Sequence, residues 1–161
     1  MELIQIQERL LSLLPMWNYQ IAKPFKQLLD EGISLEMYYC IRTLEWLGGS
    51  ATMSELSNRA KMQKQQGTKI VNRLVEQGFV TRFDDPADRR VVRVQLTDKA
   101  TGYIAHFLTH DASCFTPMLS KMSEEDLKRF DHALQELAQV FSRLPCCGPD
   151  CSDEQGACGE K

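Results

Sequence analysis

The chain has 161 residues, a length that suits one domain with a hydrophobic core of its own. Hydrophobic residues make up 43% and charged residues 25%, ordinary globular values that exclude collagen, low-complexity disorder and coiled-coil rods. The net charge of −3 argues against a general nucleic-acid binder, whose whole domain is usually basic. Charges interrupt the apolar residues at the start, and no apolar run reaches the roughly eighteen residues of a membrane span, so we expect a soluble, cytoplasmic protein.

The first thirty residues have apolar side chains at steps of three, four or seven, which predicts one face of a helix. We expect Pro15 and Pro24 to bend or interrupt this helix. A second helix should follow Gly32 and end at Gly48 and Gly49. The apolar stripe of the first segment comprises Leu3, Ile6, Leu10, Leu13, Leu14, Trp17, Ile21 and Leu28.

Thr52 and Glu55 have the spacing of a capping box, which predicts a short helix that runs to about Ala60. The next predicted helix covers residues 63–77, with apolar residues on one side and polar residues on the other. Gly78 is a natural C-terminal stop for it.

Residues 79–83 and 91–96 are rich in β-branched and aromatic side chains, and the turn-forming residues 84–90 separate them. This pattern predicts a β-hairpin with a charged tip. Residues 61–93 contain eight basic and four acidic residues, so this stretch is basic although the chain is acidic.

Thr97 is placed to cap a fifth helix that runs towards Phe115, and Ser123 with Asp126 forms a second predicted capping box. The last helix then carries an apolar seam of nearly three heptads, which is typical of a helix that packs against partner helices. Pro145 ends it, and residues 146–161 have no apolar period and are expected to be flexible. The seam comprises Leu127, Phe130, Leu134, Leu137, Phe141 and Leu144.

This order of elements predicts a winged helix-turn-helix, a mainly α fold with a small β-hairpin wing. The second helix of the pair fits the major groove, where lysine, glutamine and threonine side chains meet base edges and phosphates. Arginines at the hairpin tip can enter the minor groove, where the negative potential is concentrated. The predicted DNA-binding residues are Gln63, Lys64, Gln65, Gln66, Thr68, Lys69, Arg73, Arg89 and Arg90.

Two groups of motifs resemble those of the MarR (multiple antibiotic resistance regulator) family. Residues 52–56 and 71–80 resemble its helix-turn-helix. The wing motifs are Asp85-Pro86 and Asp88-Arg89-Arg90, followed by Leu96-Thr97. The resemblance covers about residues 1–144 and implies one domain over residues 1–145, with dimerisation helices at 1–30 and 123–144 and the winged helix-turn-helix at 34–97.

The resemblance further implies a homodimer that binds pseudo-palindromic operator DNA, usually as a repressor that an effector releases. Asp88 would brace the wing, and Arg90 would be the minor-groove arginine. The sequence departs from the family's pattern at Gln63–Gln66 and at Gly67, because a glycine inside a helix costs about 1 kcal/mol relative to alanine.

The apolar seam favours dimerisation over packing within one chain, because a single chain would leave both terminal apolar faces poorly covered. No carboxylate pair suits general acid–base catalysis and no glycine loop suits phosphate binding, so we do not expect an enzyme. Two other readings are a winged-helix module that docks on a protein and a metal-handling protein without an operator. Binding to the DNA upstream of the protein's own reading frame would separate them from a regulator.

A cysteine cluster in the last sixteen residues is the first candidate for a sensor. Its thiols could bind a soft ion such as Cu(I), Zn(II) or As(III), form disulfides under oxidation, or have no function. We rank a soft metal or metalloid first and an oxidant second. The cluster comprises Cys146, Cys147, Cys151 and Cys158.

A second candidate metal site is His106, His110 and Cys114, whose spacing of four residues places them on one face of a helix. Cys40 lies on the apolar stripe of the second helix and is interpreted as a core residue. A third effector class is an organic ligand, which the family resemblance places between the dimer helices and the DNA-binding lobe. Trp17, Tyr38 and Tyr39 are its candidate walls.

Overall fold

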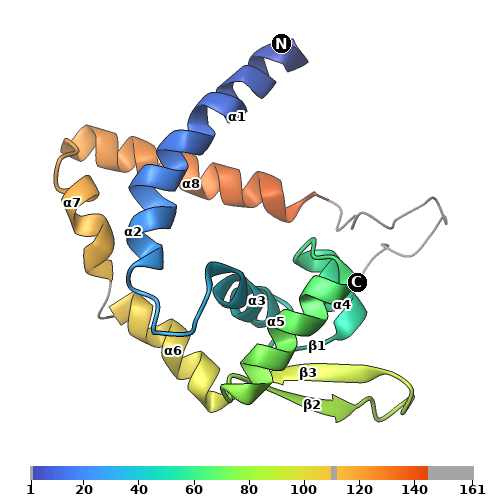
Figure 1. The fold of residues 1–161 in the computed structure, drawn as a ribbon. Helices are drawn as coiled ribbons and strands as arrows, with labels where there is room; N and C mark the ends of the chain where they lie inside the picture. Colours follow the sequence, from blue (N-terminus) through green and yellow to red (C-terminus); the bar gives the residue numbers. More distant parts are fainter. Residues whose placement is uncertain (1, 110–111, 145–161) are drawn as a thin grey trace. The chain divides into compact units, whose positions relative to one another are not determined.

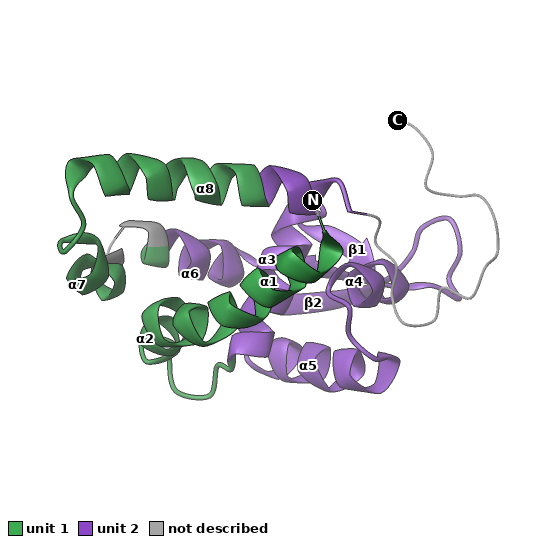
Figure 2. Cartoon of the chain, turned by 90° about the horizontal axis from the view of Figure 1, so that it is seen from above, with its two compact units in different colours: residues 1–34, 106–137 green, residues 35–105, 138–161 purple. Residues whose placement is uncertain are grey.

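The structure, a computed structural model, describes residues 2–109 and 112–144 (Figure 1). The chain divides into two compact units, which are coloured separately in Figure 2. Unit 1 comprises Met1–Ser34 and His106–Leu137, and unit 2 comprises Leu35–Ala105 and Ala138–Lys161. Among the described residues, no helix is long and apolar enough to cross a membrane.

Unit 1 is helical. Its first part runs through α1 (Leu3–Trp17), a π-helix (Asn18–Ala22) and α2 (Lys23–Lys26). Pro15 lies inside α1 and does not end it; the α-helical pattern is interrupted three residues later, where the π-helix begins. Its second part contains a 3₁₀ helix (Ala112–Phe115), α7 (Thr116–Leu119) and α8 (Glu124–Ser142). Helix α8 belongs to unit 1 as far as Leu137, and its last residues belong to unit 2.

Few side chains of unit 1 are buried. No residue of α1, the π-helix, α2, α7 or α8 is buried, although these elements carry most of the chain's apolar stripes. Phe107 is buried against Phe25, with the ring centroids 5.2 Å apart, and Phe25 also stacks on Phe115 at 6.4 Å. Apart from this aromatic cluster, the apolar faces of unit 1 are largely open.

Unit 2 contains three helices and a small sheet. The helices are α3 (Leu35–Trp46), α4 (Met53–Arg59) and α5 (Lys64–Glu76). The strands β1 (Ser50–Thr52), β2 (Val80–Asp84) and β3 (Val92–Leu96) form an antiparallel sheet in the order β1-β3-β2 (Figure 1). Helix α6 (Asp98–Thr109) begins in unit 2, and its residues from His106 onward belong to unit 1.

The core of unit 2 is closed. It draws on every helix and strand of the unit, and α3 buries one complete face. Cys40 is fully buried in this core, and burial raises the pKa of its thiol to about 12. The largest fully buried side chains are Met37, Cys40, Ile41, Leu44, Leu56, Val71, Leu74, Val80 and Val94.

The predicted mainly α fold with a β-hairpin wing is confirmed. Thr97 acts as predicted, since its hydroxyl accepts from the Ala100 N–H. The predicted capping box at Ser123 forms in part: its hydroxyl accepts from the Asp126 N–H, and the Asp126 carboxylate accepts from that same hydroxyl. Two details differ from the prediction. The sheet has a third strand, β1, and the residues just before and at Phe115, Ala112–Phe115, form a 3₁₀ helix and not part of an α-helix.

Candidate nucleic-acid interface

Helix α4 and the turn after it set the starting point of α5. The Thr52 hydroxyl accepts from the Glu55 N–H at 3.1 Å, and the Glu55 carboxylate accepts from the Thr52 N–H at 2.7 Å. This capping box contributes about 1 kcal/mol to the helix start. In the turn, Lys61 has a φ of 50°, and the Met62 N–H donates to the Ser57 carbonyl at 2.9 Å.

Gly67 allows α5 to lie close against α4. It is buried, and a Cβ built on it would come within 2.9 Å of the Ser57 Oγ. Its low helix propensity, which counted against it in the sequence, is therefore offset by a close approach that the short α4–α5 turn requires. The departure from the family's pattern at this position has a packing reason.

The face of α5 opposite the core is polar and exposed. Gly67, Ile70, Val71 and Leu74 are buried, and their spacing leaves the remaining side of the helix to solvent. The seven residues predicted to bind DNA from this segment, six in α5 and one at its N-cap, are all exposed. They are Gln63, Lys64, Gln65, Gln66, Thr68, Lys69 and Arg73.

Two residues of this face have part of their hydrogen-bonding capacity fixed. The Thr68 hydroxyl donates to the Lys64 carbonyl at 2.9 Å. Thr68 can therefore offer an outside partner only the lone pairs of its hydroxyl oxygen and its methyl group. Gln63 occupies the N-cap position but makes no side-chain cap, and its amide therefore stays available for an outside contact.

The cations of this face are electrostatically uncompensated. Within the described residues, Lys64, Lys69 and Arg73 take part in no ion pair, and Glu76 is the single acidic residue of α5. Isolated exposed cations on one helix face produce a local positive potential on an acidic chain. Such a face suits a polyanion.

The wing loop is organised around Asp85. Its carboxylate accepts from the Arg93 guanidinium at 3.1 Å and from the Ala87 N–H at 2.8 Å, and its own N–H donates to the Val91 carbonyl at 2.8 Å. The hydrogen bond from the Ala87 N–H and the pairing with Arg93 lower the pKa of the Asp85 carboxyl. The carboxylate is therefore ionised at neutral pH and holds the two ends of the loop together.

Asp88 acts within the tip itself. Its carboxylate accepts from the Arg90 N–H at 3.0 Å, and its carbonyl accepts from the Val91 N–H at 2.9 Å. Arg89 and Arg90 are exposed in the turn that these bonds close, and neither forms an ion pair among the described residues. The tip thus presents two solvated guanidinium groups on a hydrogen-bonded loop.

The sequence analysis missed two residues of this surface. Asn72 is exposed on α5 beside Arg73, and an asparagine amide is suited to an adenine edge. Asp85 was named only as part of the wing motif, and its ion pair was not predicted because the partner, Arg93, lies eight residues away across the hairpin. The polarity of the open face of α5 could have indicated Asn72. The ion pair between Asp85 and Arg93 could be predicted only once the register of the hairpin was known.

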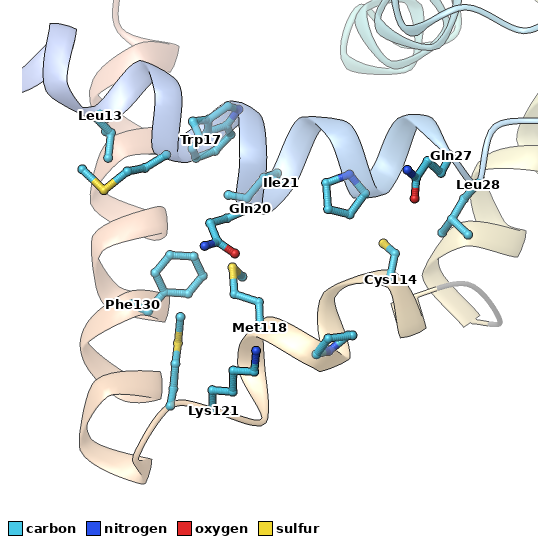
Figure 3. Close-up of a pocket in the computed structure, with 14 residues that line it drawn as sticks. Leu13, Trp17, Gln20, Ile21, Gln27, Leu28, Cys114, Met118, Lys121 and Phe130 are labelled. Atoms are coloured by element: carbon cyan, nitrogen blue, oxygen red, sulfur yellow. The ribbon is translucent and has the colours of Figure 1, made fainter.

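Unit 1 contains a cavity of about 730 Å³, whose wall is shown in Figure 3. Trp17, Ile21, Cys114, Met118 and Phe130 lie around it. A smaller cavity shares Trp17, Ile21, Met118 and Phe130 with the first. The lining is mostly apolar, with room for a small organic molecule.

The predicted sensor residues are only partly described. Cys146, Cys147, Cys151, Cys158 and His110 lie outside the described residues. His106 is exposed in α6, whereas Cys114 lies in the 3₁₀ helix that follows, so the predicted continuous helix face does not extend to Cys114. Within the described part of the chain, no group of three histidine, cysteine or acidic residues could hold a metal ion.

The three aromatic residues predicted as walls for an organic ligand belong to different units. Trp17 lines the cavities of unit 1. Tyr38 and Tyr39 are neighbours in α3 of unit 2, with ring centroids 6.3 Å apart. Burial raises the pKa of the Tyr38 phenol, and Tyr39 is half exposed.

Comparisons with known proteins agree with this geometry. A model of the MarR family matches residues 32–91. The uncharacterized HTH-type transcriptional regulator YsmB of Bacillus subtilis is 29% identical over 62% of this chain and 70% of its own length. The organic hydroperoxide resistance transcriptional regulator of the same organism is 27% identical over 86% of this chain and 92% of its own length. A mutant MarR from Escherichia coli, solved in complex with operator DNA, has a TM-score of 0.62 at 19% identity and covers 85% of this chain and 99% of that one.

The matched family region begins three residues before α3 and runs into the wing, and it includes the polar face of α5 and the arginine tip. The relatives are named as transcriptional regulators, a class of DNA-binding proteins that are not enzymes. The family model, the named relatives and the shared fold together indicate a MarR-family winged-helix transcriptional regulator.

Proposed function

We propose that this regulator is a homodimeric repressor that binds a pseudo-palindromic operator and leaves it when an effector binds. Helix α5 enters the major groove, and Arg90 enters the neighbouring minor groove from the wing. The distance between the two α5 helices of the dimer matches about one DNA turn, roughly 34 Å, and the effector changes this distance.

The DNA-binding part of the proposal is supported by the positive charges of α5 and the wing that have no acidic partner within the part of the chain that the structure describes. Lys64, Lys69 and Arg73 have no ion-pair partner among the described residues, and the tip arginines sit on a loop fixed by Asp85 and Asp88. Cations held on a rigid scaffold lose little conformational freedom on binding phosphate, and each neutralised phosphate releases counterions.

The homodimer rests on the open apolar faces of the terminal helices. Leu10 and Leu14 of α1 are 51% and 63% exposed, and Phe141 of α8 is 55% exposed. Monomeric proteins rarely leave apolar areas of this extent in water. A second copy of the chain supplies the same two helices and covers these faces symmetrically.

For the effector we propose a soft metal or metalloid ion bound by the C-terminal cysteines, with an oxidant as the second candidate. Four thiols within sixteen residues supply enough soft ligands for one ion. The relative named for organic hydroperoxide resistance supports the oxidant. A small organic ligand in the cavity of unit 1 is the third candidate.

The test of DNA binding is a titration of the DNA upstream of the protein's own reading frame with the wild-type protein and the Arg90→Ala variant. The variant should bind all sequences about tenfold more weakly and should lower the slope of log affinity against log salt by about one. Arg129→Ala, which removes an arginine that is 76% exposed on α8, serves as the charge control. An unchanged salt slope in Arg90→Ala would remove the wing contact from the proposal.

The test of the effector uses a chain truncated after Pro145. The truncated protein should bind the same DNA as the full chain but lose its response to Cu(I), Zn(II), arsenite and peroxide. Metal analysis of anaerobically purified full-length protein identifies the ion. An unaltered response after truncation would place the sensor in the body of the protein.

A further inference from the structure

The C-terminal end of α5 is bound to the first turn of α6. The Lys99 Nζ donates to the Gln77 carbonyl at 2.7 Å. The Thr97 hydroxyl donates to the Gly78 carbonyl at 2.6 Å, and the Thr97 N–H donates to the Phe79 carbonyl at 3.0 Å. Three consecutive carbonyls that follow α5 are thus each hydrogen-bonded from the beginning of α6.

Side chains reinforce the same junction. Phe79 is buried, and the Lys99 Nζ lies 4.5 Å from its ring centroid, within the range of a cation–π interaction. The Tyr103 ring meets Phe79 edge to face with the centroids 5.2 Å apart. Gly78 turns the chain with a φ of 75°, and Lys99 Cδ lies 4.0 Å from where a Cβ on this glycine would be.

Lys99 lies where a lysine stabilises the end of a helix, which most surface lysines do not. A helix ends with carbonyls that lack intrahelical partners, and a cation there also interacts favourably with the helix dipole. Gln77 is the C-cap residue of α5, so the Lys99 ammonium lies at the negative end of the helix that carries the polar DNA-facing side. Its contact partners are backbone and ring atoms of this junction.

Helix α6 contributes residues to both units. It starts at Asp98 in unit 2, and from His106 its residues belong to unit 1. The first turn is where Thr97 and Lys99 hold α5.

We propose that Lys99 is a positioning residue for operator recognition, which fixes the orientation of α5 from the first turn of α6. This inference rests on the proposed entry of α5 into the major groove. Lys99 acts through the Gln77 carbonyl and the Phe79 ring and makes no DNA contact of its own. It therefore affects the match to the operator and leaves the number of neutralised phosphates unchanged.

The experiment compares Lys99→Met, which keeps the aliphatic stem and removes the ammonium, with Lys99→Arg, which keeps a donor and the charge. Lys128→Met controls for the loss of one exposed positive charge, since Lys128 is 75% exposed and lies outside the apolar seam. Each full-length protein is titrated with the DNA upstream of its reading frame and with unrelated DNA at several salt concentrations. Hydrogen exchange of the amides at the end of α5 is measured without DNA.

For Lys99→Met we expect operator affinity to fall about fivefold while affinity for unrelated DNA and the salt slope stay as in the wild type. The amides from Arg73 to Phe79 should exchange faster than in the wild type. Lys99→Arg should restore both properties, and Lys128→Met should change neither.

Two results would overturn the proposal. An equal loss on all DNA with a salt slope lower by about one would make Lys99 a phosphate contact. Unchanged exchange at the end of α5 in Lys99→Met would show that the lysine does not hold the helix. Because the exchange measurement needs no DNA, it decides on the role of Lys99 even if the wild-type protein fails to bind the operator fragment, a result that would count against the proposed function alone.

Discussion

In unit 2, α3 alone buries Met37, Cys40, Ile41 and Leu44, whereas no residue of α1 or α8 is buried although both helices are rich in leucine. Unit 2 buries its apolar side chains within one chain, whereas most apolar side chains of unit 1 are left exposed. The hydrophobic effect acts equally on both, so a protein with this distribution gains its missing burial from another surface. This difference supports the proposal that unit 2 carries the DNA-binding face and that the terminal helices form the dimer.

The largest expected effect comes from a charge on the open face of α1. Leu10→Glu should weaken the proposed dimer by more than a hundredfold, because it buries an unpaired carboxylate in an apolar interface. Sedimentation velocity over a concentration series measures the dimer constant.

Gln5→Glu, which adds the same charge to the polar side of α1, should leave the dimer intact. A Leu10→Glu protein that dimerises like the wild type would remove α1 from the interface and break the contrast between the units.

The second effect tests the closed core of unit 2. Leu44→Ala should lower the free energy of unfolding by about 3 kcal/mol, since Leu44 is fully buried and truncation leaves a cavity. Chemical denaturation followed by far-UV circular dichroism measures the change. Trp46→Ala in the same helix removes a side chain that is 68% exposed and should change stability by less than about 0.5 kcal/mol. Similar losses in both variants would contradict the burial described for α3.

The third effect concerns the close contact of α4 with α5. Gly67→Ala alone should be close to neutral, because its gain of helix propensity is offset by contact with the Ser57 hydroxyl. In a Ser57→Ala background the same substitution should stabilise the protein by about 1 kcal/mol, since the crowding atom is gone. Thermal unfolding of the four proteins of this cycle gives the coupling. Additive effects would show that the two residues do not limit each other.

The smallest effect is the pH dependence of the wing. Because the folded pKa of Asp85 is lowered, its stabilising contribution is complete above the pKa of an unfolded aspartate and is lost as the pH falls through the lowered folded value. An NMR titration of the Asp85 carboxyl should give a midpoint below the usual aspartate range. Arg93→Gln should raise that midpoint only in part, since the Ala87 N–H still donates. A midpoint at the usual value would mean that the loop is not held by this carboxylate.

Local sequence signals predicted much of the fold. The capping box at Thr52 and Glu55 formed as predicted, and the hairpin predicted at 79–83 and 91–96 formed at 80–84 and 92–96, because both features depend on neighbouring residues. Strand β1 was not predicted because three residues carry no period, and its pairing is with Arg93, Val94 and Gln95, far along the chain. The α5 surface residues followed from periodicity, whereas the Asp85–Arg93 pair and the Gly67 contact depend on tertiary geometry that no local pattern contains.

The π-helix at Asn18–Ala22 has a consequence for how this protein can change by insertion or deletion. A π-helical turn holds about one residue more than an α-helical turn. Deleting one residue from this segment would turn it into regular α-helix, and the residues before it would keep nearly the same direction relative to those that follow, because the extra residue is the one removed. A deletion inside the α-helical part of α1 would instead rotate the leucines that precede it by about 100°. A single-residue deletion should therefore disturb the apolar stripe least when it falls within Asn18–Ala22.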